Sequence, residues 1–307
     1  MSGIEGRRAK VSRRLVAAGF GVAAARLIFP DGASAGARLY RQPREKQYPF
    51  FDEATASVIP PSGYQARIAL KDSIAKLVRH RVISRDKYRE LQRLNGQSQS
   101  EFAQLPVVPS NTPIRLTRDN AGNYVNLLWP VGLSNRLDAN TGSPLNGPNL
   151  DGFASTGGWT LGMEATGGGY FNKFPIVEMS PAAETLAVRV AKSTYRPCCN
   201  NSTFFQDCNH GSALFAVLQL GASQGLAEAE LYREALAFNS FWFPDYYIAT
   251  ALYFKVARKM DWKNVDAKLI MGPEFSAGGP WQQNVMVPLQ AYKDLVPGPG
   301  AGANCGT

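Results

Sequence analysis

The sequence is poor in the residues on which most hydrolases rely for acid–base catalysis, because it contains only two histidines in 307 residues. Few histidines are therefore available to serve as the base of a Ser–His–Asp triad. Glycines cluster at 157–158 and 167–169. Neither cluster has the lysine of a G-x-x-x-x-G-K-[ST] phosphate loop, and neither forms a G-x-G-x-x-G turn between a strand and a helix. The sequence thus argues against a serine hydrolase and against a nucleotide-binding enzyme.

The excess of positive charge does not predict a nucleic-acid partner. The formal net charge is +9, but residues 1–35 hold six basic and two acidic residues, so they contribute +4 and the remaining chain only +5. Blocks of Lys and Arg interleaved with aromatic residues, which single-strand binders use, are missing. We therefore expect no binding to nucleic acid.

The first 35 residues have the order of a secretory signal peptide. A basic segment at 7–14 is followed by a short apolar run at 15–25 and by Ala-Ser-Ala at 33–35, the small-residue form of a cleavage site. The pair Arg13-Arg14 resembles the twin-arginine type of bacterial signal; the alternative is an Arg-rich amphipathic helix. The apolar run is too short to span a bilayer. We expect an exported bacterial protein, periplasmic or secreted, with no transmembrane segment in the mature chain.

Hydrophobic periodicity predicts a mainly α fold in which the C-terminal part is a helical assembly and the middle segment is irregular and weakly β. An α+β fold is the alternative. Apolar residues recur at helical spacing in six segments, near 68–78, 84–92, 181–192, 213–225, 228–238 and 248–260. We expect an extended linker at 36–62, a single α-rich domain at 63–296 and a Gly-rich tail at 297–307. His80 falls at a helix end, where an imidazole complements the helix dipole.

Three of the four cysteines and the second histidine lie in one stretch, residues 198–211, with the spacing C-C-x8-C-x-H. The stretch separates two predicted helices. The fourth cysteine, Cys305, lies in the Gly-rich tail. Aromatic residues flank the stretch. Packing in the core explains most of them, and the alternative is that they line a pocket for a small molecule beside the cysteines.

One interpretation of this stretch is structural. An exported protein meets an oxidising compartment in which disulfides persist. Cys199 with Cys208 would close the loop, and Cys198 with Cys305 would fasten the tail. The protein would then be a disulfide-stabilised binding protein without catalysis.

A second interpretation, which we favour, is a metal site. Thiolate and imidazole are the ligands expected for zinc or copper(I), and the stretch offers Cys198, Cys199, Cys208 and His210. The spacing is not that of a known zinc module, because C-x2-C pairs are absent.

A third interpretation is a thiol-dependent enzyme. If a helix begins after Cys208, its positive end favours the thiolate and lowers the pKa. His210 would pair with Cys208 as its base, and Cys198 or Cys199 would resolve an oxidised sulfur. The catalytic residues would be Cys208 and His210.

Several phrases of the sequence resemble a family of uncharacterised bacterial proteins. They are residues 126–129, 154–159, 195–199 and 207–211, the last two of which enclose the cysteine stretch. The resemblance implies a bacterial setting and carries no implication about mechanism.

Overall fold

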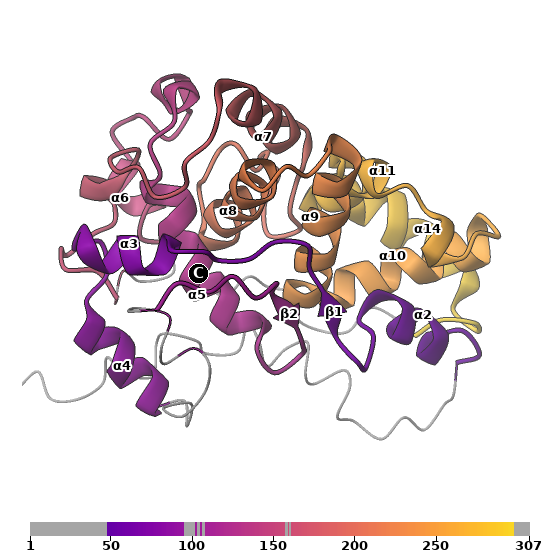
Figure 1. The fold of residues 1–307 in the computed structure, drawn as a ribbon. Coiled ribbons are helices and arrows are strands. Elements are labelled where there is room, and N and C mark those ends of the chain that lie inside the picture. The colour runs from indigo at the N-terminus through magenta and orange to yellow at the C-terminus, as the bar shows by residue number, and fades with distance from the viewer. Residues whose placement is uncertain are drawn as a thin grey trace, which may run out of the picture.

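A computed structural model describes residues 48–94, 102, 105, 108–156, 159 and 161–297, and this part of the chain is mainly helical, which confirms the predicted fold class (Figure 1). The predicted signal peptide and Cys305 lie outside the described residues. None of the described helices is both long enough and apolar enough to cross a membrane.

The α-helices follow the chain from α2 to α14: α2 (Phe51–Val58), α3 (Ser73–Arg79), α4 (Arg85–Leu94), α5 (Ala121–Ser134), α6 (Leu150–Phe153), α7 (Pro181–Ser193), α8 (Asn209–Ser223), α9 (Glu228–Trp242), α10 (Pro244–Ala257), α11 (Ala267–Met271), α12 (Pro273–Ser276), α13 (Gly278–Trp281) and α14 (Val287–Leu289). Short 3-10 turns are η3 (Asp138–Gly142), η4 (Gly168–Tyr170), η5 (Trp262–Asn264) and η7 (Gln290–Tyr292), and η6 (Gln282–Met286) is a π-helical turn. Strands β1 (Tyr64–Gln65) and β2 (Arg115–Leu116) form one antiparallel pair.

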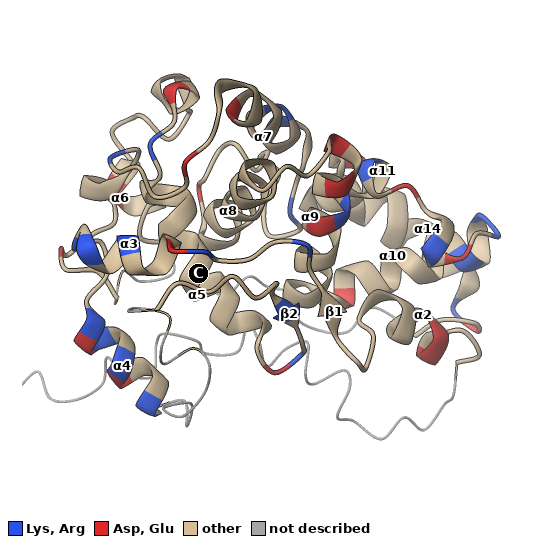
Figure 2. Cartoon of the chain, viewed as in Figure 1, with Lys and Arg blue, Asp and Glu red and all other residues tan. Residues whose placement is uncertain are grey.

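Helix α8 is the centre of the fold. Every residue from Gly211 to Ala222 is buried, and α8 carries no charged side chain (Figure 2). A helix that is apolar on all sides must be covered on all sides. Helices α5, α7 and α9 contact it, and Figure 1 shows α7 above it and α9 beside it.

Helix α5 approaches α8 unusually closely because of a glycine. A Cβ placed on Gly132 would lie 1.9 Å from the carbonyl oxygen of Ser212 and 3.1 Å from the backbone nitrogen of Ala216. Only glycine lets the two backbones touch at this point. The contact fixes the first turn of α8, in which Ser212 lies, against α5.

The helix predicted after Ser180 begins where the sequence indicates. The Ser180 side chain accepts a hydrogen bond from the Ala183 N–H at 3.2 Å, and Pro181 occupies the first helical position. A serine cap followed by proline is a strong start signal. His80 is the residue that ends α3, as expected, and its ring stacks on Phe174 at a centroid distance of 4.7 Å.

The predicted extended linker at 36–62 is wrong for residues 51–58, which form helix α2. Phe51, Ala54, Thr55 and Val58 are buried along one side of that helix, which packs on α10. Lys255 of α10 also pairs with Glu53 at 2.9 Å. The flanking prolines suggested an irregular strap, but apolar spacing over two turns and burial against α10 stabilise a helix.

The middle segment is less β-like than the sequence indicates. Within the described residues, the apolar run at 124–129 lies in the buried helix α5. The strands β1 and β2 pair Tyr64 with Leu116 and Gln65 with Arg115, and isolated bridges occur elsewhere, such as Ile83 with Gly162. A short apolar run fits either a buried strand or a buried helix, so periodicity alone does not separate them.

Candidate functional site

The cysteine stretch is a loop that leaves α7 and returns into α8. Its base is closed by threonines, because the Thr203 N–H donates to the Thr194 carbonyl at 2.8 Å and their hydroxyl groups lie 3.0 Å apart. Beside them, the Phe204 N–H donates to the Ala191 carbonyl of α7. These hydrogen bonds therefore hold the two ends of the loop together.

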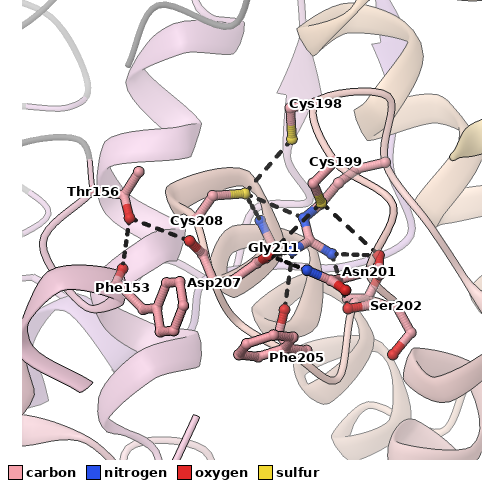
Figure 3. Close-up of polar contacts among 12 residues, drawn as sticks. Phe153, Thr156, Cys198, Cys199, Asn201, Ser202, Phe205, Asp207, Cys208 and Gly211 are labelled. Atoms are coloured by element: carbon pink, nitrogen blue, oxygen red, sulfur yellow. Dashed lines mark hydrogen bonds and ion pairs between the residues drawn. The ribbon is translucent and has the colours of Figure 1, made fainter. Parts of the chain in front are cut away.

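Arg196 organises the interior of this loop. Its side chain is fully buried, and a buried guanidinium needs an acceptor for each of its five N–H groups. All have one (Figure 3), and the acceptors are Cys208 Sγ at 3.2 Å, the carbonyls of Asn201 at 3.1 Å, Ser202 at 2.9 Å and Phe205 at 2.9 Å, and the Asp207 carboxylate. The loop is wrapped around this one side chain.

A glycine admits the guanidinium beneath the first turn of α8. A Cβ on Gly211 would lie 2.7 Å from Cζ of Arg196. The Gly211 N–H points at Cys208 Sγ, at 3.4 Å, so Cys208 caps the helix. The helix N-terminus and the guanidinium are both positive, and the negative groups beside them are the Asp207 carboxylate and the Cys208 sulfur.

Asp207 links this charge arrangement to a second cysteine. Besides its ion pair with Arg196, its carboxylate accepts a hydrogen bond from Asn201 Nδ2 at 2.5 Å. The Cys199 thiol lies 3.9 Å from Asp207 Oδ1. The carboxylate thereby orients the Cys199 side chain.

The three sulfur atoms of Cys198, Cys199 and Cys208 lie within 4.8 Å of one another. The sulfurs of Cys198 and Cys208 are 3.6 Å apart, and a dashed line joins them in Figure 3. Each of the three cysteines is a half-buried thiol, so the expected disulfide between Cys199 and Cys208 is not formed. The predicted Cys305 partner of Cys198 lies outside the described residues.

His210 is placed differently from the sulfurs. The ring lies against Phe243, at a centroid distance of 4.5 Å, and against Trp242, at 5.9 Å. Burial lowers its pKa, which favours a neutral ring. The structure thus brings together the three predicted thiol ligands, whereas the imidazole is not among the atoms of that close set.

The cysteines differ in their acidity. Hydrogen bonds from Cys198 and Cys199 hold the pKa of Cys208 well below its usual value; burial opposes this and the charge on Arg196 adds to it. For Cys199, a hydrogen bond with Cys198 lowers the pKa, but a bond with Cys208 and burial outweigh it and raise the pKa to about 12. The thiolate is therefore favoured at Cys208 over Cys199.

The guanidinium stays charged in this environment. Burial by itself lowers the pKa of Arg196, but its electrostatic interactions with Cys208, Cys198, Cys199 and Asp207 outweigh burial and raise the pKa above the ordinary value. The cation and the sulfur cluster thus stabilise each other.

The segment from α11 to α13 covers the tip of the loop. Three hydrogen bonds join the two: Tyr195 N–H to the Met271 carbonyl at 2.9 Å, Gly278 N–H to the Cys199 carbonyl at 3.1 Å, and Gly279 N–H to Asn200 Oδ1 at 2.8 Å. A Cβ on Gly278 would meet the Pro197 carbonyl oxygen at 2.8 Å. The backbone of the vicinal cysteines is therefore held from outside the loop as well.

Sequence patterns alone did not identify Arg196 as part of the site. The available signals were an arginine two residues before the paired cysteines and an acidic residue directly before Cys208. Neither is specific, because arginines beside cysteines are usually exposed and only the folded loop shows this one to be buried.

Residues 221–225 also have the spacing G-x-S-x-G, the pattern that surrounds the nucleophile of many serine hydrolases. Ser223 is the last residue of α8, and its hydroxyl donates to the Leu220 carbonyl at 2.9 Å. A nucleophilic serine in this pattern requires a sharp turn from a strand into a helix. Residues 221–223 are instead the end of α8, so this glycine–serine pattern marks a helix C-terminus and not a nucleophile turn.

Comparison with family models, with curated proteins and with solved structures finds no match for this chain.

Proposed function

We propose that the protein binds a thiophilic metal ion, zinc or copper(I), through Cys198, Cys199 and Cys208. The observation that carries the proposal is the convergence of the three sulfurs within 4.8 Å. Thiolates are the ligands that zinc and copper(I) prefer. The proposed setting is a bacterial periplasm or exterior, where the basic, apolar and small-residue order of residues 1–35 would direct the chain.

The spacing of the sulfurs fits such an ion. Zn–S bonds of about 2.3 Å in tetrahedral geometry separate two sulfurs by about 3.8 Å. Cys198 and Cys208 are 3.6 Å apart, so small side-chain rotations suffice. Three protein ligands leave the fourth tetrahedral position for water or a further ligand.

Hydrogen bonds around the cluster hold two of the cysteines in position before a metal ion binds. Arg196 and the Gly211 N–H hold the Cys208 sulfur in place, and the hydrogen bonds from α13 hold the Cys199 backbone. Little ordering is then required when the ion binds. Cys199 must lose its proton on binding, so affinity should rise with pH.

Exchange of a single sulfur tests the proposal. In Cys208→Ser we expect the metal affinity to fall by at least roughly 100-fold, because a ligand is lost and such a loss exceeds the effect of a supporting residue. Elemental analysis of protein purified in reductant, followed by competition with a chromophoric chelator, measures this.

The matched control is His210→Gln, which removes the imidazole that was also predicted as a metal ligand and that lies two residues after Cys208. We expect it to retain one metal ion per chain, since its ring packs on Phe243. Loss of metal in His210→Gln with retention in Cys208→Ser would contradict the proposed ligand set.

A second candidate function is a thiol-dependent enzyme with Cys208 as the nucleophile. Two N–H donors, from Arg196 and Gly211, point at its sulfur, an arrangement that favours the thiolate. His210 would not be required as a base, because these donors act on the sulfur directly.

The acidity of Cys208 gives this candidate its own test. An ordinary thiol of pKa about 8.5 loses roughly tenfold in alkylation rate per pH unit below that value. Because the pKa of Cys208 is lowered, its alkylation rate should fall less steeply than that of Cys199 between about pH 8.5 and about pH 6.5. Iodoacetamide labelling of metal-free protein, with fragment-resolved mass spectrometry, measures each cysteine. A Cys208 rate that falls in parallel with that of Cys199 would refute the assignment.

A further inference from the structure

The three thiols of the cluster are not equivalent in what each can bond to. Cys198 Sγ lies 3.6 Å from Cys208 Sγ. Cys199 Sγ lies instead at 3.9 Å from Asp207 Oδ1 and at 4.0 Å from the Asn201 carbonyl. Cys198 and Cys208 therefore form the pair whose sulfurs lie 3.6 Å apart, whereas Cys199, although within 4.8 Å of both, is also directed toward oxygen acceptors.

The backbone around Cys199 reinforces this difference. Its carbonyl accepts the Gly278 N–H at 3.1 Å, and the next side chain, Asn200, accepts the Gly279 N–H at 2.8 Å. These bonds restrain the Cys199 backbone, so its sulfur can approach Cys208 by side-chain rotation alone. Closing Cys198 onto Cys208 requires the two sulfurs to approach from 3.6 Å to about 2.05 Å.

We propose that Cys198 and Cys208 form a reversible disulfide in response to a hydroperoxide, and that this disulfide expels the bound metal. The inference rests on the proposed metal-binding function and adds its regulation. The bond removes two of the three ligands and leaves Cys199 as the remaining thiol, which cannot hold the ion alone.

The chemistry balances with hydrogen peroxide as the oxidant. The Cys208 thiolate attacks one peroxide oxygen, the O–O bond breaks, and hydroxide leaves, which gives a sulfenic acid on Cys208. The Cys198 sulfur then attacks the Cys208 sulfur; the S–S bond forms, the S–O bond breaks, and the Cys198 proton leaves with the hydroxyl as water. Two thiols lose two electrons, and one peroxide becomes two waters once a proton neutralises the hydroxide.

The loop around the pair should survive this change. Four of the five N–H bonds of Arg196 go to oxygen acceptors, which the disulfide leaves in place. The Thr194 and Thr203 bonds at the base of the loop are also independent of the sulfurs. Reduction therefore restores the same site.

The test starts from full-length reduced protein loaded with one equivalent of Zn²⁺. Hydrogen peroxide is added, zinc release is followed with a chromophoric indicator, and disulfides are mapped by mass spectrometry. We expect one disulfide, between Cys198 and Cys208, zinc release in step with its formation, and recovery of binding after dithiothreitol and fresh zinc.

Two variants separate the possible pairings. Cys199→Ser should still form the disulfide, whereas Cys198→Ser should form none and should carry Cys208 on to sulfinic acid. A disulfide that includes Cys199 or Cys305, or zinc that stays bound after the Cys198–Cys208 bond has formed, would overturn the switch alone. Reduced protein that binds neither Zn²⁺ nor Cu⁺ would overturn the proposed function, and the switch with it.

Discussion

Replacement of Arg196 by leucine is expected to lower the free energy of unfolding by about 3–5 kcal/mol, the range found when one partner of a buried ion pair is removed. The Asp207 side chain is only 10% exposed, so its carboxylate would lose its cation without gaining water. The carbonyls of Asn201, Ser202 and Phe205 would lose their donors too. We also expect metal binding to be lost, because the hydrogen bonds of Arg196 hold the cysteine loop in its conformation.

Lysine should not rescue the Arg196 site. A lysine presents three N–H donors on one nitrogen and lacks the planar fork that reaches acceptors on several sides. The five contacts of Arg196 are spread over both terminal nitrogens and Nε. Arg196→Lys should therefore recover less than half of the lost stability.

Urea denaturation measures both Arg196 variants, and Arg189→Leu is the matched control. Arg189 lies on α7 and pairs with Glu228 at 2.8 Å, but its side chain is 57% exposed. Exposed pairs contribute up to about 1 kcal/mol. Equal losses in Arg189→Leu and Arg196→Leu would show that the loop does not depend on the buried guanidinium.

Gly132→Ala is expected to destabilise the protein by about 3 kcal/mol or more, at the upper end for overpacking. The added methyl carbon would stand 1.9 Å from the Ser212 carbonyl oxygen, and both backbones are fixed in helices. Relief requires α5 and α8 to separate. Because Ser212 follows Gly211, the separation would also displace the cap at Cys208 and weaken metal binding.

The same substitution elsewhere on α5 provides the control. Gly122 also lies in α5, but a Cβ placed there has nothing within 4 Å. Gly122→Ala should be neutral or stabilising by up to about 1 kcal/mol, the helix preference of alanine over glycine. Thermal unfolding of both variants decides the matter, and a Gly132→Ala protein as stable as the Gly122→Ala protein would refute the close contact.

Helix positions in the C-terminal part were predictable because their signals are local. Ser180 and Pro181 mark a helix start, and the apolar residues after Cys208 mark a buried helix. Helix α2 was missed because the flanking prolines suggested an irregular segment despite two turns of apolar spacing. The helical nature of 124–129 was missed because a short apolar run fits a strand as well as a helix. Tertiary contacts with α10 and α8 determine their structure.

The site shows the same division between local and distant causes. The grouping of Cys198, Cys199 and Cys208 follows from their closeness in sequence, and the apolar residues after Cys208 placed it at a helix start. The sequence did not indicate that the Cys208 sulfur itself caps that helix. The burial of Arg196 was not predictable, because it depends on Gly211 leaving room for it and on α13 covering the loop. The position of His210 against Phe243 depends on α9 and α10, which are distant in sequence.

The central claim, that three thiolates hold the ion, is tested most directly by X-ray absorption at the metal edge of zinc-loaded, reduced protein. The account predicts three sulfur neighbours at about 2.3 Å, with any fourth position filled by a light atom that lacks the outer-shell scattering of an imidazole. A first shell with fewer than three sulfurs, or with a clear imidazole contribution, would contradict it.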